Sequence, residues 1–136
     1  MKLLLDTHAL LWYLTTPEKL PSAAHLAIQS ADNEVFASLA SAWEISIKVA
    51  LGRLEFDTQG LERALVAVGV EALGIGLQHT ARIAELPQHH GDPFDRMLVA
   101  QALCESMTLV SRDRELAKYG IRLLWRDASA APGRNA

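Results

Sequence analysis

The chain opens with KLLLDTHALLW at residues 2–12. Lys2–Leu5 is a short apolar run, which is typical of a strand buried on both faces of a sheet. Asp6 places a polar residue at the carboxyl end of this strand, and Thr7–Leu14 follows as a helix of one or two turns that stops before Pro17. A buried strand that leads directly into a helix indicates an α/β fold.

The alternation of short apolar strands and helices continues along the chain. Strands are expected at 34–37, 72–75, 108–111 and 122–125, and helices at 21–30, 39–51, 57–69, 77–85, 93–106 and 114–118. This order predicts a central parallel sheet with helices on both faces, because parallel crossovers cover both faces of a sheet. We expect residues 1–127 to form one domain and the small, polar residues 128–136 to form a flexible tail.

Composition excludes several classes of protein. Half of the 136 residues are apolar and the net charge is −3, which argues against a general polyanion-binding surface. Any nucleic-acid activity must then depend on a local site, and acids neutralised by a bound metal would reconcile an acidic chain with an anionic substrate. A single cysteine, Cys104, excludes a disulfide framework and a cysteine metal site.

The first apolar stretch, Leu3–Leu14, does not have the pattern of a signal peptide. It is interrupted by Asp6 and His8 and lacks a basic lead and a small-residue cleavage site. No other stretch approaches the roughly 18 apolar residues that a membrane span needs. We therefore expect a soluble, cytoplasmic protein that does not contact a membrane.

Two acids follow predicted strands. Asp6 ends the first strand, and Asp113 lies two residues after the strand at 108–111. Open parallel sheets have their sites beyond the carboxyl ends of the strands, so this common position links the two residues. Each acid could instead be the N-cap of the helix that follows it, and position alone leaves both interpretations open.

Glu44 lies on a predicted helix, at the margin of an apolar stripe. The stripe consists of Leu39, Ala42, Trp43, Ile47 and Ala50. Glu44 could face a cleft at this margin, or it could form an ordinary surface pair with Lys48 at i,i+4.

The segment Asp92-Pro93-Phe94-Asp95 has the chemistry of a helix start. Asp92 is a good N-cap, Pro93 suits the first helical position, and an acid at the third position resembles a capping box. The functional interpretation keeps Asp92 as the cap and directs Asp95 into the same cleft as Asp6.

Four blocks of this chain, taken together, resemble the PIN-domain proteins, in particular the group with DTHALLW. The blocks are LLDTHALLW at 4–12, SAWEISIK at 41–48 with GRL at 52–54, HGDPFDRMLVAQA at 90–102 and TLVSRD at 108–113. They occur in the family order, and the resemblance covers residues 4 to 125, nearly the whole chain. Any one block would be a weak signal, whereas the four together are specific.

The resemblance implies a PIN-like three-layer fold, with about five parallel strands and acids gathered at the carboxyl end of the sheet. In the VapC-type toxins of bacterial toxin–antitoxin pairs, such a site is a magnesium- or manganese-dependent endoribonuclease. Carried over by position, the catalytic residues and metal ligands are Asp6, Glu44, Asp95 and Asp113. Oxygen ligands suit Mg²⁺ or Mn²⁺, which would be the cofactor.

Four further residues are candidates for positioning the substrate. The resemblance implies Thr7 and Ser111 as hydroxyl groups near the metal, with serine in place of the commoner threonine at the second position. Arg96 and Arg112 could contact phosphate, the alternative being that each is a solvated charge.

The expected function is therefore that of a toxin that hydrolyses RNA, forms a homodimer and is inhibited by a small VapB-like antitoxin. The alternative is a catalytically silent PIN-like module that binds RNA or an antitoxin, against which the presence of all four acids argues. A phosphatase on another α/β fold is disfavoured because the chain has no DxDxT pattern.

Two other groups of residues invite functional interpretations that we disfavour. His89-His90 is not expected to bind a transition metal, because adjacent histidines rarely share one ion and nothing completes a zinc set. Trp12, Trp43 and Trp125 are expected to be core or interface aromatics instead of platforms for base stacking.

Overall fold

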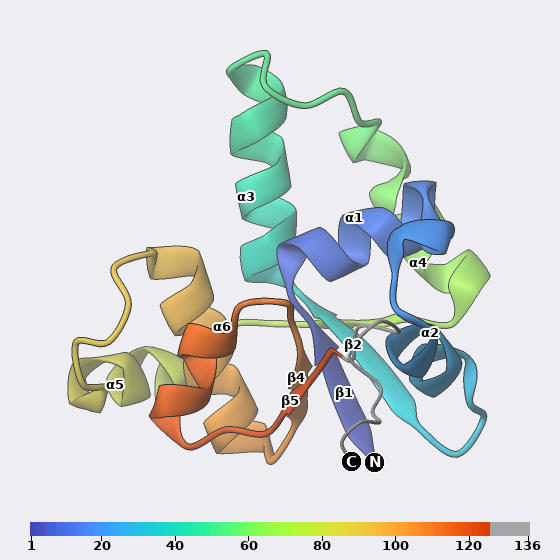
Figure 1. Ribbon diagram of the computed structural model, residues 1–136. Helices are drawn as coiled ribbons and strands as arrows, with labels where there is room; N and C mark the ends of the chain where they lie inside the picture. The colour runs from blue at the N-terminus through green and yellow to red at the C-terminus, as the bar shows by residue number, and fades with distance from the viewer. Residues whose placement is uncertain (126–136) are drawn as a thin grey trace.

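The structure, a computed structural model, describes residues 1–125 and consists of a sheet surrounded by helices (Figure 1). The strands are β1 (Lys2–Leu5), β2 (Glu34–Ser38), β3 (Glu71–Leu73), β4 (Thr108–Val110) and β5 (Leu123–Leu124). The α-helices are α1 (Thr7–Thr15), α2 (Ser22–Gln29), α3 (Leu39–Ala50), α4 (Leu61–Val68), α5 (Leu77–Glu85) and α6 (Pro93–Glu105). Three short 3₁₀ helices are η1 (Pro17–Lys19), η2 (Thr58–Gly60) and η3 (Arg114–Tyr119). The tail predicted at 128–136 lies outside the described residues.

The five strands are all parallel, in the order β3-β2-β1-β4-β5. Strand β1 is central, with β2 on one side and β4 on the other. The chain crosses from β1 to β2 in one direction and from β4 to β5 in the other. The gap beyond β1 and β4 is therefore a topological switch point, where open α/β sheets bind their ligands.

Strand β1 is buried on both faces of the sheet. Leu3 and Leu5 point into one core with residues of α1 and α2, whereas Leu4 points into a second core with residues of α6 and η3. All three leucines have no exposed surface, and their alternation follows the two-residue period of a strand. The predicted parallel sheet between two helical layers is confirmed.

Local boundaries differ from the predictions at several places. The strands expected at 72–75 and 122–125 lie at Glu71–Leu73 and Leu123–Leu124, and the helix expected at 114–118 is the 3₁₀ helix η3. The helix expected from residue 57 begins at Leu61, because η2 precedes it and the side chain of Asp57 makes no capping bond. It ends at Gly69, whose φ of 74° is a left-handed conformation that favours glycine. The turn η1, at Pro17–Lys19, was not predicted. Within residues 1–125, no helix is long and apolar enough to cross a membrane.

The apolar stripe of α3 does not face the core. Leu39, Trp43 and Ile47 are 49%, 61% and 37% exposed, while the buried face carries the smaller Ala40 and Ser41 together with Ile45. Small side chains let α3 pack closely at the end of the sheet, so its larger apolar residues lie on the outside. Within residues 1–125 the Trp43 ring contacts Phe94, with ring centroids 5.2 Å apart, and most of this face stays exposed, which is typical of a surface that binds a partner.

Candidate active site

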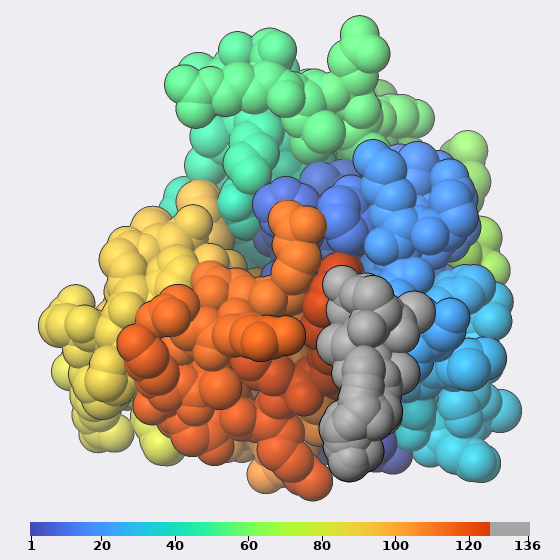
Figure 2. All heavy atoms as spheres, in the orientation of Figure 1, coloured from blue at the N-terminus to red at the C-terminus, as the bar shows by residue number. Residues whose placement is uncertain are grey.

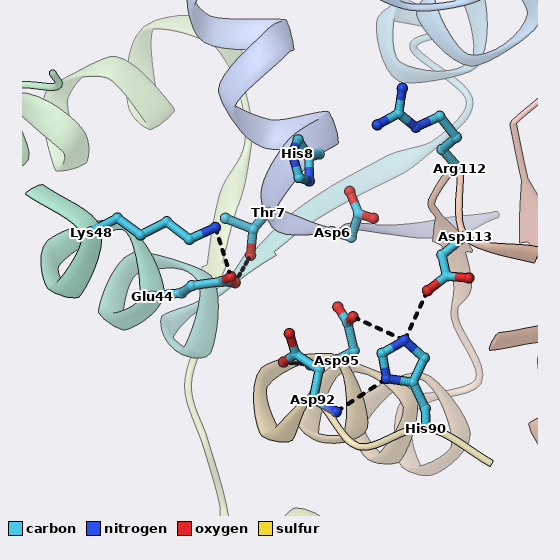
Figure 3. Close-up of a pocket in the computed structure, with 10 residues that line it drawn as sticks. All are labelled: Asp6, Thr7, His8, Glu44, Lys48, His90, Asp92, Asp95, Arg112 and Asp113. Atoms are coloured by element: carbon cyan, nitrogen blue, oxygen red, sulfur yellow. Dashed lines mark hydrogen bonds and ion pairs between the residues drawn. The ribbon is translucent and has the colours of Figure 1, made fainter. Parts of the chain in front are cut away.

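A cleft of about 490 Å³ opens at the carboxyl end of the sheet, beyond β1 and β4 (Figure 3). It is lined by Asp6, Thr7, His8, Glu44, Lys48, His90, Asp92, Asp95, Arg112 and Asp113. The four predicted acids therefore converge on one cleft, although they come from the end of β1, from α3, from α6 and from the segment after β4.

Asp6 follows β1 directly and is only 8% exposed. One of its oxygens, Oδ1, accepts a hydrogen bond from the Ala9 amide at 2.8 Å and so caps α1. Burial raises the pKa of Asp6, while the hydrogen bonds from Ala9 and Ser111 and the charge of His8 lower it; the charge of Glu44 raises it further. The buried carboxylate thus depends on neighbouring groups to carry its charge.

Asp113 is also a helix cap and a lining residue of the cleft. Its Oδ1 accepts from the Glu115 amide at 3.0 Å at the start of η3, and its Oδ2 accepts from His90 Nε2 at 2.8 Å. The Asp113 amide donates to Ser111 Oγ at 3.1 Å, which fixes the turn after β4. Capping occupies one oxygen only, so the two interpretations that sequence left open are compatible.

Glu44 reaches the cleft from α3 and is held by two side chains. The Thr7 hydroxyl donates to Glu44 Oε1 at 2.6 Å, and Lys48 Nζ lies 3.2 Å from Oε2. Ser41 Oγ, which is fully buried, lies 3.0 Å from the Thr7 hydroxyl. The ion pair of Glu44 with Lys48 that the sequence left open is therefore present, and both residues line the cleft.

Asp95 is positioned by the start of α6. Asp92 Oδ1 accepts from the amides of Phe94 at 2.8 Å and Asp95 at 3.1 Å, with Pro93 in the first turn, so the predicted cap is present. Burial, followed by the charges of Asp92 and Asp6, raises the pKa of Asp95 to about 7, and the charge of His90 opposes this shift. Asp95 is thus a carboxylate crowded by other carboxylates.

His90 lies between two of the acids. Its Nε2 is 2.8 Å from Asp113 Oδ2 and 3.5 Å from Asp95 Oδ2, while its Nδ1 accepts the Asp92 amide at 3.2 Å (Figure 3). Because Nδ1 accepts, the ring proton is on Nε2, which donates to Asp113. His89 instead packs against Tyr119, with ring centroids 5.1 Å apart.

The sequence did not predict the position of His90 between two acids, because His89 and His90 were considered only as a candidate pair of ligands for a transition metal. The available signal was its position two residues before the cap Asp92, because a side chain there can turn back toward the start of α6. In this arrangement His90 Nε2 donates to Asp113 and so orients one oxygen of that carboxylate within the cleft.

The cleft fits a hard divalent cation. One ligand atom each from His90, Asp95 and Asp113 lies within 4.8 Å of the others, and Asp6 and Glu44 line the same space. The pKa values of Asp6 and Asp95 are raised by burial and by mutual repulsion, both of which a bound cation would relieve. Carboxylate oxygens are the ligands that Mg²⁺ prefers.

Arg96 does not lie in the cleft, contrary to its predicted role in positioning the substrate. It is 9% exposed, and its guanidinium donates to the carbonyls of Pro87 (2.8 Å), Ile83 (3.3 Å) and Leu86 (3.5 Å) and to the Tyr119 hydroxyl (3.1 Å). It is not a solvated charge either. Arg96 links α6 to the last turn of α5 and to the loop that follows it, because the carbonyls of both accept its guanidinium.

The other three positioning candidates lie at or beside the cleft. Thr7 and Arg112 line it, and the Arg112 guanidinium also lies over the Trp12 ring, 5.2 Å from its centroid. Ser111 is 1% exposed and lies behind Asp6, whose pKa its hydroxyl lowers. The basic side chains that line the cleft with the acids are His8, Lys48, His90 and Arg112.

Comparisons with known proteins agree with this architecture. The PIN domain family model matches residues 3–122. The chain is 32% identical over 123 residues to Ribonuclease VapC22 of Mycobacterium tuberculosis (strain ATCC 25618 / H37Rv), which covers 85% of this chain and 90% of that protein.

Two solved structures have the same fold. One is VapBC2 from Rickettsia felis, bound to a DNA fragment from its promoter, with a TM-score of 0.70, 16% identity and coverage of 93% of this chain and 100% of that one. The other is VapBC-1 from nontypeable Haemophilus influenzae, with a TM-score of 0.65, 16% identity and coverage of 93% and 98%. On the strength of the family match and the 32% identical relative, this chain belongs to the PIN-domain family, among its VapC-type proteins.

Proposed function

We propose that this protein is a metal-dependent endoribonuclease that hydrolyses RNA phosphodiesters at the carboxylate cleft and acts as the toxin of a toxin–antitoxin pair. The observation that carries the proposal is the convergence of Asp6, Glu44, Asp95 and Asp113 from four elements on one cleft at the switch point of the sheet. The relative at 32% identity is named a ribonuclease, which supports RNA as the substrate.

Asp6, Asp95, Asp113 and Glu44 would hold Mg²⁺ or Mn²⁺. Such an ion activates water and stabilises negative charge on a phosphate. The expected number of protein ligands is small, because Mg²⁺ keeps several of its waters and takes substrate oxygens as ligands. Burial and the charges of neighbouring acids raise the pKa of Asp95 to about 7, and a bound cation would offset both effects, which supports a metal site.

The remaining side chains of the cleft orient the acids or attract the substrate. Thr7 and Lys48 fix the two oxygens of Glu44, and His90 fixes one oxygen of Asp113 by donating to it. Lys48 and Arg112 line the cleft as cations, so they would attract a phosphodiester to an otherwise acidic protein.

We assign the exposed apolar face of α3 to protein partners, namely a small antitoxin and a second copy of the chain. Leu39, Trp43, Ile47 and Leu51 leave this face apolar and open in the single chain. The solved structures of the same fold are VapBC complexes, which supports a partner of the antitoxin class. A soluble toxin acting on RNA would work in the cytoplasm.

Cleavage of RNA by the purified protein tests the proposal. With Mg²⁺ or Mn²⁺ we expect cleavage that a chelator abolishes, and a loss of about 100-fold or more in Asp6→Asn and Asp95→Asn, because each loses a ligand of the ion that stabilises the transition state. The matched control is Asp32→Asn, which changes an exposed aspartate in the loop before β2, at the opposite end of the sheet.

Two results would contradict the proposal. Cleavage that continues undiminished in Asp6→Asn and Asp95→Asn would place the chemistry elsewhere. RNA binding without metal-dependent cleavage, across varied RNAs, would indicate a catalytically silent module.

A further inference from the structure

A second pocket, of about 410 Å³, lies beside the acidic cleft. Its wall is formed by Trp12, Lys19, Pro21, Ser22, Arg112 and Trp125, with Glu18 and Leu20 also lining it. The N-terminal helical segments, in blue, and the segment after β4, in orange, meet on the face of the molecule shown in Figure 2. The proposed nuclease chemistry does not use this pocket.

The aromatic wall of the pocket is held in place by packing against the hydrophobic core. The rings of Trp12 and Trp125 have centroids 5.8 Å apart and planes inclined by 42°. Both side chains are half-buried and pack against the core that contains Leu3, Leu5 and Leu10. Each ring therefore has one part fixed in the core and another part at the pocket, which suits a rigid platform for a flat, apolar group.

Two cations lie over the same aromatic ring. Lys19 Nζ is 5.7 Å and the Arg112 guanidinium 5.2 Å from the centroid of Trp12. Within residues 1–125, neither side chain forms an ion pair, and both are exposed. With Glu18 as the single acid of the pocket, the local balance is positive in a protein whose net charge is −3.

The pocket adjoins the acidic cleft, and two residues connect their walls. Arg112 lines both cavities, and it directly precedes Asp113 in the chain. His8 lines the cleft and contacts the edge of Trp12, with ring centroids 6.1 Å apart. A polymer whose phosphodiester lies among the acids would therefore have its neighbouring unit beside Trp12 and Trp125.

We propose that this pocket is a subsite for a nucleotide of single-stranded RNA next to the cleaved bond. Arg112 and Lys19 bind the backbone phosphate, and the base stacks against Trp12 and Trp125. The inference rests on the proposed ribonuclease function. Aromatic faces with adjoining cations are the combination that binds single-stranded nucleic acid, because bases stack on rings and phosphates pair with cations. Trp12 and Trp125 also pack against the core, so the stacking role is added to the sequence expectation that they are core or interface aromatics.

Binding of a fluorescently labelled, mixed-sequence, single-stranded RNA of about ten nucleotides tests the subsite, measured over a range of salt concentrations. All proteins carry Asp95→Asn, so that cleavage does not consume the probe. We compare this parent with Lys19→Gln, Trp125→Leu and the control Lys2→Gln. Lys2 is an exposed lysine at the amino end of β1, at the opposite end of the sheet from the cleft.

The two substitutions are expected to have different signatures. Lys19→Gln should lower the slope of log Kd against log salt by about 0.7, the value for one phosphate contact of a single strand. Trp125→Leu should weaken binding about tenfold with the slope unchanged, because stacking of a base is not ionic. Lys2→Gln should change neither quantity. Since Lys19 is exposed, its substitution keeps the test valid even if Trp125→Leu impairs folding.

Cleavage kinetics of the otherwise unmodified protein provide the second arm. With an RNA long enough to reach the pocket, Lys19→Gln should raise KM several-fold and leave kcat unchanged. With an RNA too short to reach the pocket, it should have no effect. If the Asp95→Asn parent binds RNA and the wild type cleaves it, but the Lys19 and Trp125 variants match them, the subsite is refuted and the nuclease proposal stands. If the parent binds no RNA and the wild type cleaves none, the nuclease proposal itself fails. If the variants lose a protein partner and retain RNA binding, the pocket is a protein-docking site and the inference is wrong.

Discussion

Asp6, Asp92 and Asp113 each use a carboxylate oxygen to begin a helix, and each also lines the cleft. A capping bond fixes the side-chain torsions of an aspartate and leaves the second oxygen available. For Asp113 this second oxygen accepts from His90, at 2.8 Å. Capping therefore orients these acids toward the cleft, and the same bond that stabilises a helix start helps to organise the site.

The raised pKa of Asp95 predicts a stability that falls with pH in the metal-free protein. Its pKa is about 7 in the folded chain and 3.8 as the reference value, so the folded state binds the proton more tightly. Stability from this residue is complete below about pH 4 and is lost as pH rises through 7. In Asp95→Asn this loss is absent, so its Tm should exceed that of the wild type at pH 8 and converge with it toward pH 4.

The size of this effect is modest because the Asp95 side chain is 25% exposed. Discounted for solvent screening, it is roughly 1–2 kcal/mol, or about 5 °C in Tm. Thermal melts at several pH values measure it, and excess Mn²⁺ should remove the pH dependence in the wild type. A Tm difference between the two proteins that does not vary with pH would contradict the assigned environment of Asp95.

Substitution of the buried Arg96 should lower the free energy of unfolding substantially. Arg96→Met removes the donor for the carbonyls of Pro87, Ile83 and Leu86 and should cost roughly 2–3 kcal/mol, since buried acceptors would lose a charged partner. The control Arg82→Met breaks only an exposed pair with Glu85 at 3.9 Å and should cost less than about 0.5 kcal/mol. Chemical denaturation compares the two, and equal losses would show that the buried contacts of Arg96 contribute nothing.

At the scale of single elements, the residues that cap the helix starts determine how the acids of the cleft are oriented. Asp92 accepts two amide bonds at the start of α6, whereas Asp57 at the start of η2 accepts none. Asp92→Ala should therefore cost about 1 kcal/mol and Asp57→Ala much less. The melts are best recorded at pH 5, where Asp95 is mostly neutral and its repulsion with Asp92 does not offset the lost cap. A larger cost for Asp57→Ala would contradict the capping account.

The outer face of α3 gives a prediction about partners. Leu51 is 60% exposed, so Leu51→Ser should change the free energy of unfolding of the isolated chain by less than about 0.5 kcal/mol. It should nevertheless weaken binding to a small VapB-like antitoxin, because an apolar contact would be lost. The comparable control is Val66→Ser on α4, which is 75% exposed and lies outside the stripe. Equal partner binding by wild type and Leu51→Ser would argue against this face as the interface.

Elements that are fixed by their own residues could be predicted from sequence. The run Leu3–Leu5 is buried on both faces, and the predicted helix at 77–85 has the observed bounds. Which face of α3 packs against the core could not be predicted. An apolar stripe indicates burial, but it does not say whether the core of the same chain or a partner protein covers the stripe. The contacts of Arg96 and His90 could not be predicted for a similar reason, since they are made with loop carbonyls and with acids that only the tertiary fold brings near.

At the scale of the whole molecule, the order of the strands explains how distant acids meet. Placing β1 beside β4 brings Asp6 close to Asp113, which is more than 100 residues away in the chain. Strand-end positions and the family resemblance were sufficient to predict this convergence, whereas the strand order itself could not be derived from local patterns. The same arrangement gives an acidic protein a cleft with cations on its edges, through Lys48 and Arg112.

Calorimetric titration with Mn²⁺ tests the central claim, that the converging acids form a divalent-cation site. The wild type and the control Asp32→Asn should bind Mn²⁺ with the same affinity at pH 8. Asp6→Asn and Asp95→Asn should each bind about tenfold or more weakly, because each loses one oxygen ligand of a hard cation. Equal Mn²⁺ affinity in all four proteins, or no binding by the wild type, would contradict the assignment of this cleft as a metal-dependent active site.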